Sequence, residues 1–279
     1  MLVMRHAWSV DASTLPALRN MLFFGKPEAP NAPHLLAMAK AAGYKTWWMS
    51  NHDDIAVAQQ HARLADEVDL VNRVPGRSSA SLDGELLDCL QEALLAPERR
   101  KFIVVHLQGA HPHYGQRFPR EFNSFDEATD PVEAALVQQG RSVWLREFRQ
   151  AYDAALLYHD FVVAEMLSST ISSQKTGEYR AFAYVSDHGQ EVGHVSDRAG
   201  HSPNTESGYR IPTLLWRSQA FDNAAQLQSQ PPRADWIGWT VADLLGLQWQ
   251  TQEPHRNVLD PRYEWLAPTL PFPVGSFLR

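Results

Sequence analysis

The chain has 279 residues and a formal net charge of −7, with 44% hydrophobic and 20% charged residues. This length allows one large domain or two small ones with a substantial core, and the composition is that of a globular rather than a disordered chain. The modest negative charge argues against a protein that binds nucleic-acid phosphates through a basic patch. A single cysteine, Cys89, excludes an intrachain disulfide.

The chain contains no run of about 18 apolar residues, so the sequence predicts no membrane-spanning helix. Its first residues, MLVMRHAWSVDAST, are too few and too polar for a signal peptide. We therefore expect either a cytoplasmic protein or one whose export segment lies outside this chain.

The N-terminal residues 1–8 are typical of a short strand, and a helix follows that opens at Ser13-Thr14-Leu15-Pro16. Leu15, Leu18, Met21 and Leu22 give this helix one apolar face. The hydroxyl at its start has two interpretations. Ser13 or Thr14 could cap the helix, or Thr14 could be a nucleophile whose phosphorylated form is held by the free N–H groups of the first turn.

Strands and helices alternate along the rest of the chain. The hydrophobic patterns predict helices over residues 33–42, 54–64, 82–95, 144–167 and 233–245, and strands over 44–49, 68–71, 102–107, 181–185 and 211–216. This alternation predicts an α/β fold, a three-layer α/β/α sandwich with a mostly parallel sheet covered on both faces. Residues 117–131 and 168–178 are predicted to be irregular, and the tail from Gln250 is predicted to be surface coil.

Polar residues follow three of these strands. Asn51 comes after the strand 44–49, His111 and His113 after 102–107, and Asp187-His188 after 181–185. The loop 193–200 then leads out and back, so that His201 returns to the same edge. The carboxyl ends of strands are where open α/β sheets bind ligands.

Asp187, His188 and the nearby histidines are candidate metal ligands. Oxygen and nitrogen donors without thiolate suit zinc or manganese, and Gly189 lets the backbone turn sharply after the pair. Asp187-His188 could equally be a turn residue beside a surface imidazole. His111 and His113 could face one site or lie in a plain loop. His159, on the buried stripe of the long helix, is predicted to be a supporting imidazole rather than a ligand.

A hydroxyl, a carboxylate and three imidazoles at one sheet edge favour phosphoryl transfer through a covalent phospho-threonine. A metal would lower the pKa of the hydroxyl and neutralise the developing phosphate charge, and a histidine could protonate the leaving oxygen.

The sequence resembles the phosphoethanolamine transferases of Gram-negative bacteria, within the alkaline phosphatase and sulfatase superfamily, and most closely the branch that modifies the lipopolysaccharide core. The matching stretches run in family order across most of the chain: STLPAL at 13–18, AGYKTWWMSN at 42–51, VHLQGAH at 105–111, RFP at 117–119, YD at 152–153, LY at 157–158, SDHGQEV at 186–192, GH at 200–201 and IP at 211–212. Each stretch alone is weak, and together they are specific.

The resemblance implies roles for individual residues. Thr14 matches the nucleophile, and Asp187 and His188 match zinc ligands beside it. His111 and His201 match histidines that bind substrate phosphate or a second zinc, and Asn51 falls near the donor head group. The implied reaction moves phosphoethanolamine from phosphatidylethanolamine onto Thr14 and then onto a lipopolysaccharide acceptor, core or lipid A. The implied cofactor is Zn²⁺, one or two ions, ahead of Mn²⁺.

The resemblance also implies one sulfatase-like catalytic domain over residues 1–279, at the periplasmic face of the inner membrane. Family members carry membrane helices, and a first strand ending in a Gly-Glu-Ser-type motif whose glutamate binds zinc. The matching stretches start after these segments, so we expect a piece of a longer protein, a mis-assigned start or a degenerate copy. Glu191 belongs to the SDHGQEV stretch and does not substitute for that glutamate. We expect a sheet without this strand to expose apolar neighbours on both sides of the gap, and the chain alone to be poorly stable or inactive.

Two other functions are compatible with these residues. One is a metal-dependent phosphodiesterase or sulfatase-type hydrolase of the same superfamily, although Cys89 lacks the Cys-x-Pro-x-Arg setting of a formylglycine sulfatase. The other is a non-catalytic remnant of the fold that binds an envelope partner.

Overall fold

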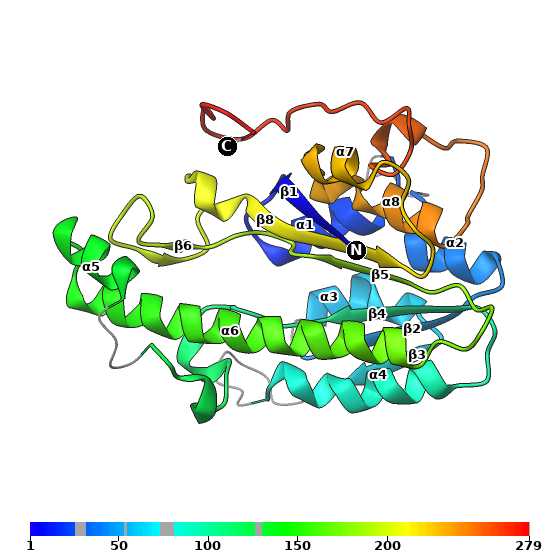
Figure 1. The fold of residues 1–279 in the computed structure, drawn as a ribbon, viewed down its shortest axis with the longest axis horizontal. Coiled ribbons are helices and arrows are strands. Elements are labelled where there is room, and N and C mark those ends of the chain that lie inside the picture. Colours follow the sequence, from blue (N-terminus) through cyan, green and yellow to red (C-terminus); the bar gives the residue numbers. More distant parts are fainter. Residues whose placement is uncertain (26–31, 53–54, 73–80, 126–129, 279) are drawn as a thin grey trace.

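Two three-stranded β-sheets form the centre of the fold (Figure 1). The computed structural model describes residues 1–25, 32–52, 55–72, 81–125 and 130–278. The first sheet has the order β3-β2-β4 and is parallel throughout, with β2 at Lys45–Ser50, β3 at Glu67–Leu70 and β4 at Lys101–His106. The second has the order β1-β8-β5 and is antiparallel throughout, with β1 at Leu2–Trp8, β5 at Ala181–Val185 and β8 at Arg210–Arg217.

Helices cover both faces of this layer (Figure 1). One face carries α1 (Thr14–Leu22), α2 (Leu35–Ala41), α3 (Ile55–Gln60) and α8 (Ile237–Leu244), which share a core with Trp48 of β2. The other face carries α4 (Leu86–Leu95) and the long α6 (Val143–Ser172), which pack on Trp47 and Met49. Side chains of β2 thus alternate between two apolar cores, as expected for a strand buried on both faces.

The α/β fold class and the helical layers on both faces are confirmed. Strand β5 has the predicted bounds, while the other predicted strands begin or end within one residue of theirs. The prediction of a mostly parallel sheet holds for β2, β3 and β4 but not for β8, which runs antiparallel to both neighbours. The sequence does not determine this direction, because an apolar run reads the same way in either direction.

Helix α6 extends five residues beyond its predicted end, so the irregular linker predicted over 168–178 was wrong at its start. The hydroxyl of Thr170 donates to the carbonyl of Met166, and Thr170 is buried. Serine and threonine disfavour helix interiors because they compete for backbone partners, but a bond back to the preceding turn is compatible with the helix.

Shorter elements connect these layers. β6 (Glu191–Val192) and β7 (Ala199–Gly200) form a small hairpin around the loop that precedes His201. Helix α5 (Pro131–Gln138) follows the irregular range, of which residues 126–129 lie outside the described part of the chain. Helix α7 (Ala224–Ser229) precedes α8. The C-terminal tail is coil with one 3-10 turn, but its aromatic side chains pack on Trp8, whose indole Nε1 donates to the carbonyl of Phe277.

Within the part of the chain that the structure describes, no helix has both the length and the apolar character needed to cross a bilayer.

Candidate functional site

Thr14 is the first residue of α1, and its hydroxyl points at the imidazole of His188. Its Oγ1 lies 3.4 Å from Nε2 of His188. Ser13 occupies the N-cap position in an extended conformation, yet its side chain makes no capping hydrogen bond. The structure therefore places the Thr14 hydroxyl beside a candidate metal ligand, at a helix start where backbone N–H groups favour an anion.

Asp187 and His188 directly follow β5, where the sequence predicts them. Oδ2 of Asp187 lies 3.6 Å from Nε2 of His188. The hydroxyl of Ser9, a fully buried residue just after β1, donates to the carbonyl of Asp187. The N–H of Gly189, the residue after His188, donates to the carbonyl of Gly208 at 2.9 Å. The turn is therefore fixed from two sides.

The ring of His188 is oriented by its own turn. Its Nδ1 lies 2.9 Å from the carbonyl oxygen of Gly189, so Nδ1 carries the proton and donates it there. The lone pair of Nε2 then faces Thr14 and Asp187. A second hydrogen bond that fixes the tautomer in this way is the usual arrangement for a metal-ligating histidine.

Four more histidines continue the site. His201 packs edge-on against His188 with ring centroids 4.5 Å apart, and His111 packs edge-on against His201 at 5.3 Å. His52 contacts His111 at 5.6 Å and stacks on His106 at 5.1 Å. The structure thus brings together Thr14, His111, Asp187, His188 and His201, as predicted. His113 is exposed and has a left-handed backbone, so it lies in the plain loop.

His111 is a neutral imidazole at neutral pH. Burial, followed by the neighbouring His52 and His201, lowers the pKa of His111 to about 4. Burial and His52 also lower the pKa of His106 to about 4. A cluster of neutral imidazoles offers both N–H donors and free nitrogen lone pairs.

Asn51, directly after β2, is 1% exposed. Its amide Nδ2 donates to Oδ1 of Asp83 at 2.9 Å. The same carboxylate accepts from the backbone N–H groups of Gln108 and Gly109, two residues before His111. Burial alone would raise the pKa of Asp83, but the imidazole of His159, 3.9 Å away, and hydrogen bonds from Asn51 and the two amides outweigh burial and lower it. Asp83 therefore ties the ends of β2 and β4 together.

Sequence reasoning missed Asp83 because an aspartate at a helix start indicates a cap. It also missed Arg117 as a support of the site. Arg117 is 4% exposed, and its guanidinium donates to Oε1 of Gln108 at 2.7 Å and to the carbonyl of His111 at 3.4 Å. His159 has the predicted supporting role, since its Nε2 lies 2.8 Å from the hydroxyl of Tyr184.

The distances of Thr14 and Asp187 from His188 fit the spacing of neighbouring ligands in a zinc site. Zinc bonds of about 2.0–2.2 Å in tetrahedral geometry place neighbouring donors about 3.3–3.6 Å apart. The separations of His188 Nε2 from Thr14 Oγ1 and from Asp187 Oδ2, 3.4 and 3.6 Å, match this spacing. Among the described residues, no three His, Cys, Asp or Glu side chains are grouped so as to hold a metal.

Comparison with known families identifies the fold. The sulfatase family model matches residues 7–247, a span that includes every site residue described above. The chain belongs to the sulfatase family.

The sulfatase relatives with similar sequences are phosphoethanolamine transferases. The chain is 30% identical over 269 residues to phosphoethanolamine transferase EptC of Escherichia coli (strain K12), covering 90% of this chain and 45% of that protein. It is 29% identical over 268 residues to phosphoethanolamine transferase CptA of Salmonella typhimurium, with the same coverage. The chain thus spans about half the length of these relatives.

A solved structure shows the same fold. The C-terminal periplasmic domain of Escherichia coli EptC, crystallised in complex with Zn, superimposes with a TM-score of 0.85 at 28% identity, over 95% of this chain and 77% of that chain. The sulfatase-like architecture expected from the sequence is therefore confirmed.

Proposed function

We propose that this sulfatase-family chain transfers phosphoethanolamine through a covalent intermediate on Thr14. The observation that supports this function is the position of the Thr14 hydroxyl, at a helix start and 3.4 Å from an imidazole nitrogen whose proton lies on the opposite side of the ring. The names of the relatives EptC and CptA support the group that is moved.

The first step forms a bond between Thr14 Oγ1 and the phosphorus of phosphatidylethanolamine. The bond from phosphorus to the diacylglycerol oxygen breaks, and that oxygen takes a proton from His201. His201, which is exposed, acts here in its protonated form and is left neutral. The proton of the Thr14 hydroxyl passes to solvent. His111, neutral and half-buried, donates its N–H to a phosphate oxygen.

The second step returns Thr14 to its starting state. A hydroxyl or phosphate oxygen of the lipopolysaccharide acceptor, core or lipid A, attacks the phosphorus, and the bond to Thr14 Oγ1 breaks. Where the acceptor is a hydroxyl, its proton passes to the now neutral His201. The proton donor of the first step and the proton acceptor of the second are then the same histidine.

Thr14, Asp187 and His188 would hold zinc, with Mn²⁺ as a weaker alternative. Bound at these donors, zinc supplies positive charge that lowers the pKa of the Thr14 hydroxyl and offsets phosphate charge. Asn51, held by Asp83, would lie near the donor head group. We further propose that residues 1–279 act as one catalytic domain at the periplasmic face of the inner membrane, as the description of the EptC domain supports.

Mass spectrometry tests the intermediate. The chain is incubated with zinc chloride and mixed micelles of phosphatidylethanolamine, without acceptor, and digested. We expect a peptide carrying one phosphoethanolamine group on Thr14. Thr14→Ala should abolish the adduct, while His113→Ala, a change at the exposed histidine outside the site, should preserve it.

Two results would contradict the proposal. A zinc-loaded chain that never carries the adduct on Thr14 rules out the covalent route. Rapid release of free ethanolamine phosphate to water indicates a phosphodiesterase rather than a transferase.

A further inference from the structure

The loop 9–13 joins β1 to α1 and leads the chain to Thr14, the first residue of that helix. Ser9 begins this loop and is 0% exposed. Its Oγ lies 2.5 Å from the carbonyl oxygen of Asp187 and 2.9 Å from that of Asp11, and it accepts a hydrogen bond from the backbone N–H of Asp11 at 3.2 Å. One hydroxyl therefore meets both the loop before the candidate nucleophile and the turn that carries the candidate metal ligands.

The proton of this hydroxyl goes to Asp187. A hydroxyl has one proton to donate, and the oxygen of Asp187 is the nearer of the two acceptors. The lone pairs of Oγ remain available for the N–H of Asp11, a local bond between a serine and the backbone two residues on that shapes a tight turn. Ser9 thus folds its own loop with its lone pairs and reaches the distant turn with its proton.

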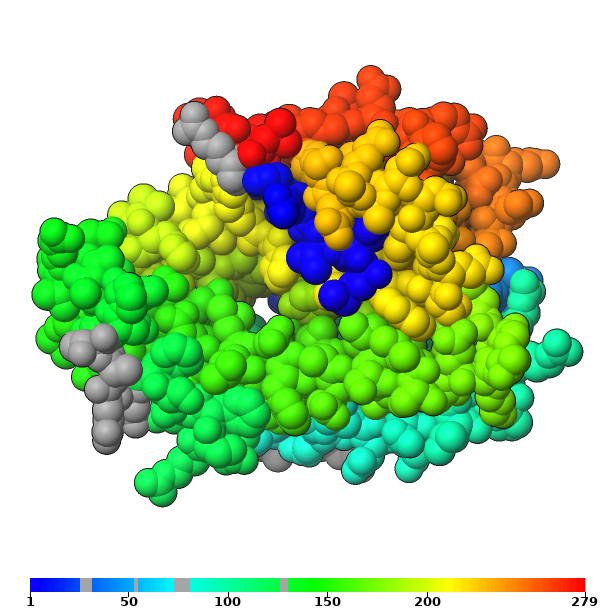
Figure 2. All heavy atoms as spheres, in the orientation of Figure 1, coloured from blue at the N-terminus to red at the C-terminus, as the bar shows by residue number. Residues whose placement is uncertain are grey.

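The bond from Ser9 to Asp187 is shielded from water. Trp8 precedes Ser9, whose N–H donates to the carbonyl of Tyr209 at 2.8 Å, and aromatic side chains of the C-terminal tail pack on Trp8 and Tyr209. The ring centroids of Trp8 and Phe277 are 4.8 Å apart, and Figure 2 shows the red tail against the blue N-terminal segment. A hydrogen bond in such a dry environment is stronger than one exposed to water, and losing it leaves a polar group unsatisfied.

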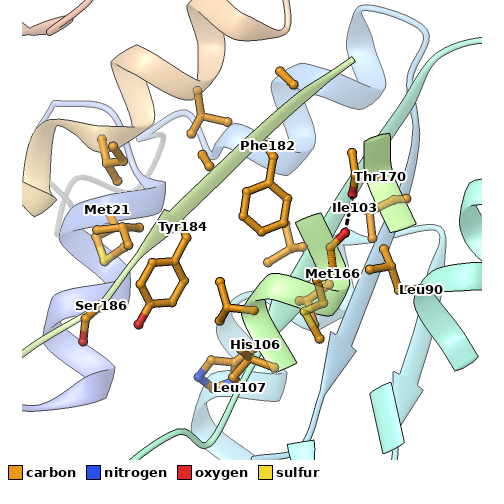
Figure 3. Close-up of a pocket in the computed structure, with 18 of the residues that line it drawn as sticks. Met21, Leu90, Ile103, His106, Leu107, Met166, Thr170, Phe182, Tyr184 and Ser186 are labelled. Carbon is orange, nitrogen blue, oxygen red and sulfur yellow. Dashed lines mark hydrogen bonds between the residues drawn. The ribbon is translucent and has the colours of Figure 1, made fainter. Parts of the chain in front are cut away.

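The loop is also tied to the helix that it precedes. Asn20 of α1 donates to Oδ2 of Asp11 at 2.6 Å. The loop and α1 therefore form one unit that carries Thr14. This unit packs beside the end of β5, and Figure 3 shows Met21 of α1 and Ser186, the first residue after β5, on these neighbouring elements.

We propose that Ser9 is a positioning residue for the transfer reaction. Its hydroxyl sets the separation of Thr14 and His188, the 3.4 Å contact on which the proposed zinc site and covalent step depend. The inference rests on the proposed function, and it gives Ser9 no contact with substrate or metal. Without the hydroxyl, the loop and the turn lose this connection, and Thr14 takes a wider range of positions relative to His188.

Thr46 provides a control for a purely structural role. It is 0% exposed near the start of β2, and its hydroxyl donates to Oδ2 of Asp66 at 2.8 Å. Thr46→Val should lower the urea midpoint but leave the zinc affinity of the folded chain within about twofold. Ser9→Ala should lower the urea midpoint and also weaken zinc binding by about tenfold or more, as the loss of an outer partner of a metal site does.

A double variant tests whether Ser9 acts through Thr14. In a Thr14→Val background one proposed ligand is already absent, so Ser9→Ala should weaken zinc binding by only about threefold or less. Ser9→Thr keeps the hydroxyl and should bind zinc within about threefold of the wild type, even where its added methyl group lowers the urea midpoint. Fully additive losses in the double variant would contradict an action through Thr14.

Amide exchange of the metal-free chain tests the same connection without zinc or turnover. One hydroxyl closes both segments, so the amides of Asp11 and Gly189 in the wild type should be protected to the same degree, within about threefold. This measurement needs no variant. In Ser9→Ala both amides should exchange faster by about tenfold or more while those of β5 are unchanged, and Thr46→Val should alter neither.

Three results would overturn the proposal. One is a Ser9→Ala chain that binds zinc as tightly as the wild type. Another is unchanged exchange of Asp11 and Gly189 in that variant. The third, which applies even if Ser9→Ala does not fold, is protection of these two amides that differs by more than about tenfold in the wild type. A wild-type chain that binds no zinc would instead contradict the proposed function, and amide exchange would still decide whether Ser9 connects the loop to the turn.

Discussion

The hydroxyl oxygen of Thr14 lies 3.4 Å from Nε2 of His188, two residues 174 positions apart in the chain. The Nδ1 proton of this histidine is held by the carbonyl of Gly189, so the nitrogen that faces Thr14 is a lone pair. The contact therefore joins a candidate nucleophile to a candidate metal ligand that cannot donate to it. Two acceptor oxygens and one imidazole nitrogen converge on the same space when Asp187 is included.

Thr14→Val tests whether this convergence binds zinc. Valine keeps the shape of threonine but removes one of the three proposed zinc ligands. We expect a zinc affinity lower by about 10–100-fold, with the free energy of unfolding of the metal-free chain within about 1 kcal/mol of the wild type. Thr14→Ser should bind zinc almost normally. Competition with a chelator measures the affinity, and a valine variant that binds as the wild type does would separate Thr14 from the metal site.

Gly189→Ala should disrupt the turn that carries Asp187 and His188. A Cβ atom there would lie 2.1 Å from the carbonyl oxygen of Ser207 and 2.7 Å from that of Arg210, so backbone must move. We expect a loss of about 2–4 kcal/mol in unfolding free energy, together with loss of zinc binding.

Gly115→Ala is the control, since nothing lies within 4 Å of its added Cβ, and it should change stability by less than about 0.5 kcal/mol. Equal urea midpoints for the two variants would show that the chain tolerates the close approach at Gly189.

Asp83→Asn should loosen the support beneath the site. Asparagine keeps the shape but replaces one acceptor oxygen by an NH₂ group, which then opposes a backbone N–H of Gln108 or Gly109. We expect destabilisation by about 2–3 kcal/mol, measured by urea unfolding. Asp88→Asn, at an exposed position of α4, is the control and should be near neutral. If both substitutions lower the free energy of unfolding by the same amount, the carboxylate of Asp83 does not tie β2 to β4.

Stability should fall at acidic pH because of His34 and His61, whose ring nitrogens Nε2 and Nδ1 lie 3.0 Å apart in the core. Burial, then His61, lowers the pKa of His34 to about 3, and burial, then Arg19, lowers that of His61 to about 4. A depressed histidine pKa means that the unfolded chain takes up protons first. The stabilising contribution is complete above pH 6.5 and is lost as the pH falls towards 4.

The expected loss is roughly 2 kcal/mol per histidine between pH 7 and pH 5. His34→Asn keeps a side chain suited to the N-cap of α2 but does not titrate, so urea unfolding at several pH values should show a shallower decline. His113→Asn, at the exposed loop histidine, should leave the decline unchanged. An unaltered slope in His34→Asn would show that this imidazole is already protonated in the folded chain.

The sequence predicts the residues of the candidate site better than it predicts the residues that hold them in place. Thr14, His111, Asp187, His188 and His201 follow strand ends or begin a helix, and such positions are marked by local patterns. The anchors of these residues come from distant segments. Asp83 meets Gln108 across 25 positions and Ser9 meets Asp187 across 178, and neither pairing leaves a local pattern.

Gly189 shows a different limit. Its sequence context indicates a sharp turn, but the structure gives it no positive φ and instead requires it for the close approach of Ser207. Glycine serves both needs, and only the neighbours distinguish them. The direction of β8 likewise cannot be predicted from its own sequence, since strand pairing depends on partners far away in the chain.

Among the described residues, β4 pairs with β2 alone and β5 pairs with β8 alone, so each strand has one open edge. These edges bear on which molecules can aggregate with this chain. An exposed edge on the outside of a sheet can meet the edge of a second folded copy, but these two edges face inward under helices on both sides. A folded neighbour is too bulky to enter, whereas a single unfolded segment is not. Folded copies should therefore stay monodisperse in solution. Small amounts of unfolded chain should nevertheless bind folded copies and start aggregation, so the stability of a stored solution depends on how completely the chain has refolded.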